Sequence, residues 1–399
     1  MRLPFFITRE GFAYLFVLAF VLAVAILRDI NLLYVVAGLM VGPLLFNGMM
    51  AALIPRGVRV RRQLPAALMA GEMLEANLSL TNPRRWLAAW LIVVTDTLER
   101  HRAPLRQRRV TATAWFPHVP AGATRHTSYR GRLTERGRYQ FGPLRLSCRF
   151  PLGLVRRTVT VPAAGEVVIY PRLGELTARA KALWRQTASG QRSSRRRGRA
   201  EAEFHGLRDW QRGDSRRWIH WRSSARRGEI VVREFEHQQH HDLAIVLDLM
   251  VAGPPTRAQI EITERAVSIA ATFIDRACAE PGSRVMLAIA AKSEMLFHGL
   301  SSPAVRAQML AALAEVEAAA INGPADARKH EARLIAALDA VGRMSRSDAP
   351  AIVVSTRDAH RAVQTSASDR AMDAAAPANW TTIDAGENGA EYVVFEERD

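Results

Sequence analysis

The sequence is short of cysteine and of acidic residues, and both shortages narrow what the protein can be. Its two cysteines, Cys148 and Cys278, fall in different predicted domains. They can build neither a disulfide framework nor a zinc cluster, because both need several cysteines at characteristic spacings. The 38 acidic residues stand against 55 Lys and Arg, which gives a net charge of +17. This excess predicts an anionic partner, such as lipid headgroups, an acidic protein or nucleic acid.

Long apolar runs, by contrast, are present at the N-terminus. The runs Gly11–Leu27 and Leu32–Ile54 are separated by the polar break Arg28–Asn31. About 20 apolar residues cross the hydrocarbon core of a bilayer, and the second run meets that length. The alternative, a signal peptide, lacks a small-residue cleavage site and is followed at once by a second run. The sequence therefore predicts a transmembrane helical hairpin over residues 1–57.

The arginines beside these runs predict an orientation. Arg2 and Arg9 precede the first run, and four arginines between residues 56 and 62 follow the second. The turn between the runs offers only Arg28, beside Asp29. Because Lys and Arg collect on the cytoplasmic side of membrane spans, we expect both termini and nearly all the remaining chain to be cytoplasmic.

Residues 58–175 have the pattern of a β-sandwich-like domain. Leu74–Leu80 alternates apolar and polar residues, while Trp90–Val94 and Thr158–Val161 are short and β-branched. Turn signals such as Thr81-Asn82-Pro83 lie between them, which is the spacing of a sandwich of antiparallel strands. No residue in this region suggests catalysis.

A basic linker, residues 176–203, follows and contains the run Arg192–Arg199. Such a run is usually a solvated loop. Beside a membrane it could also attract anionic lipid. Nucleic-acid binding is the less favoured alternative, because no interleaved aromatic residues accompany the arginines.

Residues 241–399 alternate strands and helices, which predicts a doubly wound α/β domain. The first strand, Leu243–Asp248, is wholly apolar up to its last residue, as a buried parallel strand should be. The other predicted strands are Arg284–Ala290, Glu294–His298, Pro350–Ser355, Thr381–Asp384 and Tyr392–Glu396, and the predicted helices are Pro255–Ala279, Pro303–Ala319 and His330–Met344.

Residues 204–240 form the most information-rich segment, which mixes aromatic, arginine and carboxylate residues. Gly213-Asp214 and Arg227-Gly228 read as turns, and Ile230–Phe235 reads as a strand. Between the turns, Ile219–Ala225 predicts one short helix with Trp221 as its buried anchor.

This segment resembles the signature of the domain of unknown function 58 family. The resemblance is carried, in order, by Gly206-Leu207-Arg208, Gly213-Asp214, Arg216-Arg217-Trp218-Ile219-His220-Trp221, Ala225-Arg226 and Val232-Arg233-Glu234-Phe235-Glu236. It implies two membrane spans, a β-rich region and a von Willebrand factor A-like α/β domain. It also implies a MoxR-type AAA+ ATPase as partner. The expected location is the bacterial inner (cytoplasmic) membrane, as a multi-pass protein.

Three interpretations of the segment stay open. Arginines paired with Asp209, Asp214, Glu229 and Glu234 would lock it onto the α/β domain. Exposed Trp and Arg would instead form a docking surface for a partner protein. Catalysis through His205, His220, Asp209 or Ser223 is the third, although no nucleophile elbow or metal spacing supports it. The candidate partner-binding residues are Arg208, Asp209, Trp210, Asp214, Arg217, His220, Trp221, Arg222, Arg226 and Arg233.

A von Willebrand factor A-type domain often holds a divalent cation through Asp-x-Ser-x-Ser. At the matching place Asp248 is present, but Met250 and Ala252 replace both serines. A thioether and a methyl group cannot ligate Mg²⁺, which prefers oxygen ligands. Asp358 offers a second carboxylate, yet the hydroxyl pair is still missing. We expect no functional metal site and a structural role for Asp248 as a cap or turn former.

The leading hypothesis is a non-catalytic membrane-tethered adaptor, without a cofactor, that recruits a cytoplasmic AAA+ ATPase. The first alternative is a hydrolase acting through the His220 and Asp214 region. The second is a module that binds anionic lipid or nucleic acid through Arg192–Arg199. No small-molecule substrate is indicated.

Overall fold

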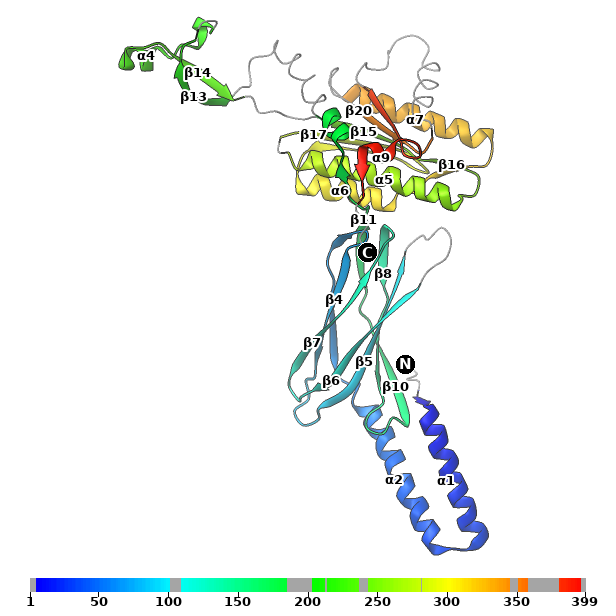
Figure 1. Cartoon of the computed structure of the whole chain (residues 1–399). Coiled ribbons are helices and arrows are strands. Elements are labelled where there is room, and N and C mark those ends of the chain that lie inside the picture. Colours follow the sequence, from blue (N-terminus) through cyan, green and yellow to red (C-terminus); the bar gives the residue numbers. More distant parts are fainter. Residues whose placement is uncertain are drawn as a thin grey trace. The chain divides into compact units, whose positions relative to one another are not determined.

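The computed structural model describes residues 5–100, 109–184, 203–211, 214–236, 243–280, 282–344, 351–357 and 380–395. They belong to two compact units, Met1–Tyr170 and Pro171–Asp399 (Figure 1). Three features discussed above, the run Arg192–Arg199, Gly213 and Asp358, lie outside the described residues.

The first unit begins with two apolar helices, α1 (Arg9–Arg28) and α2 (Asn31–Leu53). Both are long and apolar enough to cross a membrane. Their large apolar side chains are mostly exposed, with Phe16 at 75% and Leu27 at 81%. A core helix of a soluble protein would bury such side chains. The helices lie side by side (Figure 1), and the Tyr14 hydroxyl donates to the Met40 carbonyl at 2.8 Å.

The rest of the first unit, strand β1 before the helices and residues 59–170 after them, is the β domain. Its eight-stranded sheet has the order β1-β10-β9-β5-β8-β11-β3, with β6 beside β5. These strands are β1 (Phe5–Ile7), β3 (Ala67–Met69), β5 (Ala89–Arg100), β6 (Val110–Val119), β8 (Gly137–Phe141), β9 (Leu144–Cys148), β10 (Val155–Val161) and β11 (Gly165–Tyr170). The second sheet has the order β2-β4-β7, with β2 (Arg59–Gln63), β4 (Met73–Thr81) and β7 (Thr124–Arg132).

Alternation of buried and exposed residues explains how the two sheets share one core. Leu78 and Leu80 on β4 are buried with Ile92 and Val94 on β5, because every second side chain of a strand points to the same face. The same cluster includes Ile54, immediately after α2. The end of the helical hairpin is thus part of the β domain's hydrophobic core.

A buried charge pair also crosses this core. Arg62 on β2 and Asp96 on β5 lie 2.6 Å apart and are almost fully buried. The hydroxyl of Tyr129 on β7 donates to the same carboxylate at 2.6 Å. Burial and the hydrogen bond to Asp96 raise the pKa of Tyr129, so the phenol stays protonated.

The second unit contains a five-stranded sheet, which with its helices forms the α/β domain. The order is β18-β17-β15-β20-β21, and only β18 runs antiparallel to its neighbour. The strands are β15 (Leu243–Asp248), β17 (Arg284–Ala290), β18 (Glu294–Leu300), β20 (Ala351–Ser355) and β21 (Trp380–Asp384). Strand β15, the first of these five strands in the sequence, therefore lies at the centre of the sheet.

Helices cover both faces of this sheet. Helix α7 (Pro324–Met344) packs on the face that carries Ala244 and Val246. Helices α5 (Arg257–Cys278) and α6 (Pro303–Glu315) contact each other, and α5 contacts β15 from the opposite face. Shorter elements complete the unit: β12 (Glu175–Leu176), β13 (Glu203–Asp209), η1 (Arg216–Trp218), α4 (Trp221–Arg227), β14 (Val231–Glu236), β16 (Met250–Ala252), β19 (Ala319–Ile321), α9 (Gly389–Tyr392) and β22 (Val393–Val394).

Two sequence predictions are wrong in this unit. The helix predicted over Pro303–Ala319 ends at Glu315, because Ala319 pairs with Met250 as the start of β19. Tyr392, predicted as the start of a strand, ends the short helix α9, and only Val393 and Val394 pair with β12. Helix α7 begins at Pro324, six residues before the predicted start at His330, and the other predicted helices and strands agree with the structure within a few residues.

Candidate functional site

The signature segment folds into a β-hairpin that carries a short helix, here called the signature module (residues 203–211 and 214–236). Strands β13 and β14 pair antiparallel, with Arg208 opposite Val232. The Arg208 guanidinium donates two hydrogen bonds to the carboxylate of Asp214, both at 2.7 Å. The backbone N–H of Gln211 donates to the same carboxylate at 2.9 Å. These donors hold the pKa of Asp214 below its usual value, so the loop is tied to β13 by an ionised, bidentate pair.

Hydrogen bonds also fix α4 against β14. The Nδ1 atom of His220 accepts from the Ser223 N–H at 3.3 Å and caps the helix N-terminus. The buried hydroxyl of Ser224 accepts from the Val231 N–H at 2.9 Å. Gly228 ends the helix with φ of 75°, a left-handed conformation in which glycine is unstrained. The helix is therefore capped at its N-terminus by a side chain and ended at its C-terminus by a left-handed glycine.

The interior of the signature module is small, and both Trp210 and Trp221 lie outside it. Ile219, Val231 and Val232 are buried. Trp221, predicted as the buried anchor of the helix, is 68% exposed, so that prediction is wrong. The reason is that the seven-residue helix turns Ser224 toward β14 and leaves Trp221 on the solvent side.

The ten predicted partner-binding residues therefore divide into two sets. Arg208, Asp214 and His220 are half-buried and make the hydrogen bonds that shape the module. The second set is exposed and consists of Asp209, Trp210, Arg217, Trp221, Arg222, Arg226 and Arg233. The Arg208–Asp214 pair joins two parts of the module itself, whereas the sequence predicted that such pairs would join the segment to the α/β domain.

The carboxyl end of β15 carries a buried charged cluster. Asp248, fully buried, accepts from His330 Nε2 at 2.6 Å on one oxygen. Its other oxygen accepts from Ser355 Oγ at 2.8 Å and from Arg357 Nε at 3.0 Å. Burial on its own raises the pKa of Asp248, but the hydrogen bond from His330 and the charge of Arg357 outweigh it. The pKa lies below its ordinary value, and Asp248 is an ionised carboxylate.

This cluster bears directly on the degenerate cation position. Both oxygens of Asp248 face protein donors, and the guanidinium of Arg357 supplies positive charge beside it. Met250, in place of the first serine, bonds through its backbone to the Thr356 hydroxyl at 3.0 and 2.6 Å. Among the described residues, no three His, Cys, Asp or Glu side chains come together as a metal site. Asp248 does more than end a strand, because it joins β15, β20 and α7.

Sequence reasoning missed three members of this cluster: His330, Ser355 and Arg357. His330 lies 82 residues from Asp248 and begins what the sequence showed only as an amphipathic helix. The one signal in the sequence was a histidine on the inward face of that predicted helix. Its spacing from other residues did not indicate a contact with Asp248.

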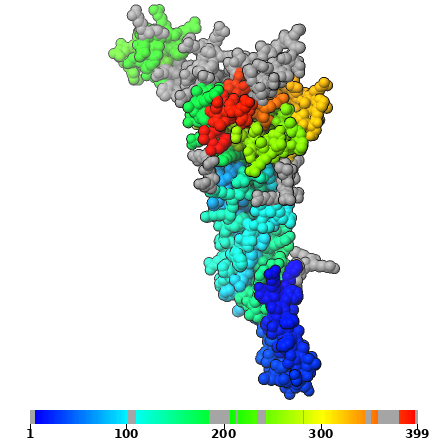
Figure 2. Space-filling model, turned by 45° about the vertical axis from the view of Figure 1, so that its right-hand side comes forward, coloured from blue at the N-terminus to red at the C-terminus, as the bar shows by residue number. Residues whose placement is uncertain are grey.

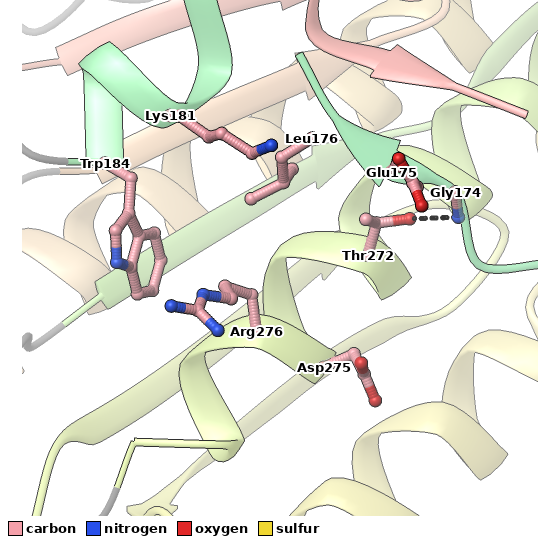
Figure 3. Close-up of a pocket in the computed structure, with 8 residues that line it drawn as sticks. All are labelled: Gly174, Glu175, Leu176, Lys181, Trp184, Thr272, Asp275 and Arg276. Atoms are coloured by element: carbon pink, nitrogen blue, oxygen red, sulfur yellow. Dashed lines mark hydrogen bonds between the residues drawn. The ribbon is translucent and has the colours of Figure 1, made fainter. Parts of the chain in front are cut away.

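A cleft of about 470 Å³ lies between residues 174–184 and α5 (Figure 3). Trp184 closes one side, and its indole N–H donates to Glu280 at 3.3 Å. Two of the four charged residues along the cleft are engaged in ion pairs, since Asp275 pairs with Arg306 and Arg276 pairs with Glu280. Charges of both signs line it, so its chemistry does not select one class of ligand. The lining residues are Gly174, Glu175, Leu176, Lys181, Trp184, Thr272, Asp275 and Arg276.

Comparison with protein families supports the resemblance carried by the signature. Residues 206–372 match the family described as "Protein of unknown function DUF58". The matched region contains most of the signature module and the greater part of the α/β domain. No curated protein matches the chain.

Solved structures resemble parts of the chain only distantly. A beta-glucosidase from Listeria innocua in complex with gluconolactone is 17% identical over 28% of this chain and 16% of that one, with a TM-score of 0.20. A CARDB domain from Pyrococcus furiosus is 10% identical over 28% of this chain and 91% of its own, with a TM-score of 0.19. The sporulation control protein Spo0M from Bacillus subtilis is 10% identical over 39% and 58%, also at 0.19. The chain spans about a sixth of the beta-glucosidase. Likeness at this level carries no argument about function.

Proposed function

We propose that this chain, whose residues 206–372 match the DUF58 family, is a membrane-anchored, non-catalytic adaptor. It presents the signature module to a cytoplasmic protein, and the resemblance implies that this partner is a MoxR-type AAA+ ATPase. The observation that carries the proposal is Trp221, exposed on α4 next to Arg222, on a module whose backbone the Arg208–Asp214 pair fixes.

Anchoring is the first part of the proposal. Helices α1 and α2 expose their apolar side chains to the surroundings, as lipid-facing helices do. Four arginines between residues 56 and 62 follow α2, so the two spans place both termini on the cytoplasmic side of a bacterial inner membrane.

We also infer the finer fold of both domains. The β domain is a β-sandwich, which is supported by two sheets that bury one shared cluster and are antiparallel except for the parallel pair β11–β3. The α/β domain is von Willebrand factor A-like. Its support is the central first strand, the antiparallel edge strand β18 and the helices on both faces of the sheet.

The exposed face of the signature module has the composition of a docking surface. Trp and Arg are the residues most enriched among those that dominate protein–protein binding energy. Trp210 and Ile230 are exposed as well as Trp221, and Arg222 and Arg226 lie on the same short helix as Trp221. A surface fixed in advance loses little conformational entropy on binding, which favours affinity. The arginines favour a partner with an acidic face.

The test is a binding measurement with the full chain in lipid nanodiscs and the purified ATPase. We expect Trp221→Ala and Arg222→Glu each to weaken binding by roughly 30-fold, the effect of losing a residue worth about 2 kcal/mol. Trp115→Ala and Arg328→Glu are matched controls, because both residues are exposed but lie outside the module. They should leave the affinity unchanged.

Two outcomes would overturn the adaptor proposal. In the first, the ATPase binds wild type and all four variants equally or does not bind at all. In the second, His220→Ala abolishes a measurable turnover while ATPase binding persists, which would favour the hydrolase. If Trp221→Ala instead lowers the unfolding temperature of the chain by several degrees, Trp221 has a structural role within the protein.

A further inference from the structure

The β domain contacts the helical hairpin at Asn47, six residues before the end of α2. The loop between β9 and β10, residues 149–154, is here called the junction loop. Its Arg149 carbonyl accepts from the Asn47 amide at 3.4 Å, and its neighbour Val155 donates its N–H to the Asn47 carbonyl oxygen at 2.8 Å. Asn47 is fully buried in this contact. One polar side chain in an apolar helix is thereby satisfied by the junction loop.

The same loop also holds the start of α1. Thr8, the N-cap of α1, donates its hydroxyl to the Gly153 carbonyl at 2.6 Å, and its N–H donates to the Leu154 carbonyl at 3.0 Å. Gly11 lies so close to Leu154 that a Cβ atom there would meet the Leu154 carbonyl oxygen at 2.1 Å. The junction loop is therefore fixed between the two helices.

Helix length places this contact relative to a bilayer. The 20 residues of α1 span about 30 Å, which is the thickness of the hydrocarbon core. Thr8 and the junction loop then lie at the boundary between hydrocarbon and headgroups. The last turns of α2, beyond Asn47, are covered by protein on one face, since Ala51 and Ile54 are buried and Ile54 belongs to the β domain core, while Met49 and Leu53 are exposed.

The side chains at this boundary suit it. Leu152, at the tip of the junction loop, is 52% exposed, and Arg149 beside it is exposed. Arg9 is exposed at the start of α1. The apolar side chain of Leu152 suits the hydrocarbon side of this boundary. The arginines beside it, Arg9 and Arg149, suit the anionic headgroup side. Glu10 is the acidic residue in the same turn of α1 as Arg9, so positive charge is in excess.

One aromatic side chain, Trp86, lies farther from the centre of the bilayer, at the level of the headgroups. Arg84 donates to the Leu53 carbonyl at 2.5 Å, which places the loop between β4 and β5 at the end of α2. Trp86 in that loop is 96% exposed. Leu53 lies six residues beyond Asn47, or about 9 Å along the helix, which reaches the outer headgroup layer. Trp is enriched at that depth because its ring is apolar and its N–H is polar.

We propose that the junction loop, Arg9 and the loop of Trp86 form a binding surface for anionic phospholipid headgroups. Leu152 enters the hydrocarbon boundary, Arg9 and Arg149 bind lipid phosphate, and Trp86 lies among the headgroups. This inference rests on the membrane anchoring proposed above. It is independent of the signature module and its partner.

The experiment uses the full chain in nanodiscs of phosphatidylcholine alone or mixed with phosphatidylglycerol. Native mass spectrometry then measures how much of each lipid stays bound to the released protein. We expect phosphatidylglycerol to be enriched over its bulk share. The double variant Arg9→Gln with Arg149→Gln should lose most of this enrichment, by about fivefold for each arginine. Arg130→Gln is the matched control, because this exposed arginine lies on β7, opposite Glu75 near the start of β4, and pairs with Glu75.

A second measurement separates lipid from free phosphate and from misfolding. Phosphatidylglycerol should raise the unfolding temperature of wild type and of Leu152→Ala, but not that of the double arginine variant. Inorganic phosphate added to phosphatidylcholine nanodiscs should not reproduce this rise. If it does, the site binds free phosphate and the lipid proposal is wrong.

Failure of the anchor and failure of this surface are distinguishable. A chain that does not enter nanodiscs, or leaves them in alkaline carbonate, contradicts the anchoring itself. A chain that inserts stably but binds both lipids in their bulk proportion, as do all its variants, overturns only the lipid surface.

Discussion

The carboxylate of Asp248 and the Nε2 atom of His330 lie 2.6 Å apart, and neither side chain is exposed to solvent. Arg357 and Ser355 donate to the second oxygen of the same carboxylate. The negative charge at the end of the central strand is therefore neutralised by the chain's own Arg357. The positive charge that balances Asp248 comes from Arg357. Removing the charge of Asp248 should therefore change the stability of the domain by an amount that can be estimated.

Replacing Asp248 with asparagine should destabilise the α/β domain by about 3 kcal/mol or more, because the variant leaves Arg357 beside an uncharged buried partner. Thermal and denaturant unfolding of the full chain measure this. Glu261→Gln, which removes an exposed carboxylate paired with Arg257, is the matched control and should change stability by less than about 0.5 kcal/mol. Equal stability of Asp248→Asn and wild type would contradict a stabilising role for the cluster.

The same carboxylate predicts a pH dependence. Its pKa in the folded state lies below the ordinary value, so Asp248 contributes stability that is fully present above the unfolded pKa of about 3.9. As the pH falls below that value through the folded pKa, the contribution is lost. The stability difference between wild type and Asp248→Asn should therefore shrink as the pH is lowered through the acidic range below about pH 4. A difference that stays constant across this range would show that ionisation of Asp248 does not matter.

The pair Arg208–Asp214 predicts an effect on order within the signature module. Asp214→Asn removes the ionised acceptor of two hydrogen bonds, so residues 209–211 and 214–215 should exchange their amide hydrogens faster. Exchange in the strands of the α/β domain should stay unchanged. The charge-swapped double variant, Arg208→Asp with Asp214→Arg, should restore part of the protection. Slow exchange in Asp214→Asn would show that the loop is held by other contacts.

The variant Gly11→Ala tests the contact between α1 and the junction loop. A Cβ atom at Gly11 would overlap the Leu154 carbonyl oxygen at 2.1 Å, whereas a Cβ at Gly38 meets no atom within 4 Å. Gly11→Ala should lower stability by about 1–3 kcal/mol because the loop must move. Gly38→Ala, in the neighbouring apolar helix, should be neutral or slightly stabilising. Unfolding in nanodiscs compares the two, and equal values would contradict the close approach.

Local patterns in the sequence predicted most elements of the fold. The apolar runs Gly11–Leu27 and Leu32–Ile54 correspond to α1 and α2, and the alternation in Leu74–Leu80 corresponds to β4. Each of these patterns expresses burial along a single element. Periodicity of side chains within that element is therefore enough to reveal it.

The candidate site was less predictable, because its geometry depends on contacts between distant residues. Trp221 looked like an anchor since large aromatic residues in short helices are usually buried, but the buried position is occupied by Ser224. His330 and Arg357 reach Asp248 only after the parallel sheet and α7 have assembled. No spacing in the chain encodes that meeting point.

The burial of Ile54 in the core of the β domain has a mechanical consequence. No flexible linker separates α2 from the first strands of that domain, and Asn47 and Thr8 add fixed points to both helices. A force exerted on the β domain is therefore transmitted directly to α1 and α2. Any partner that pulls on the β domain would pull on the two helices that we propose to be the membrane anchor.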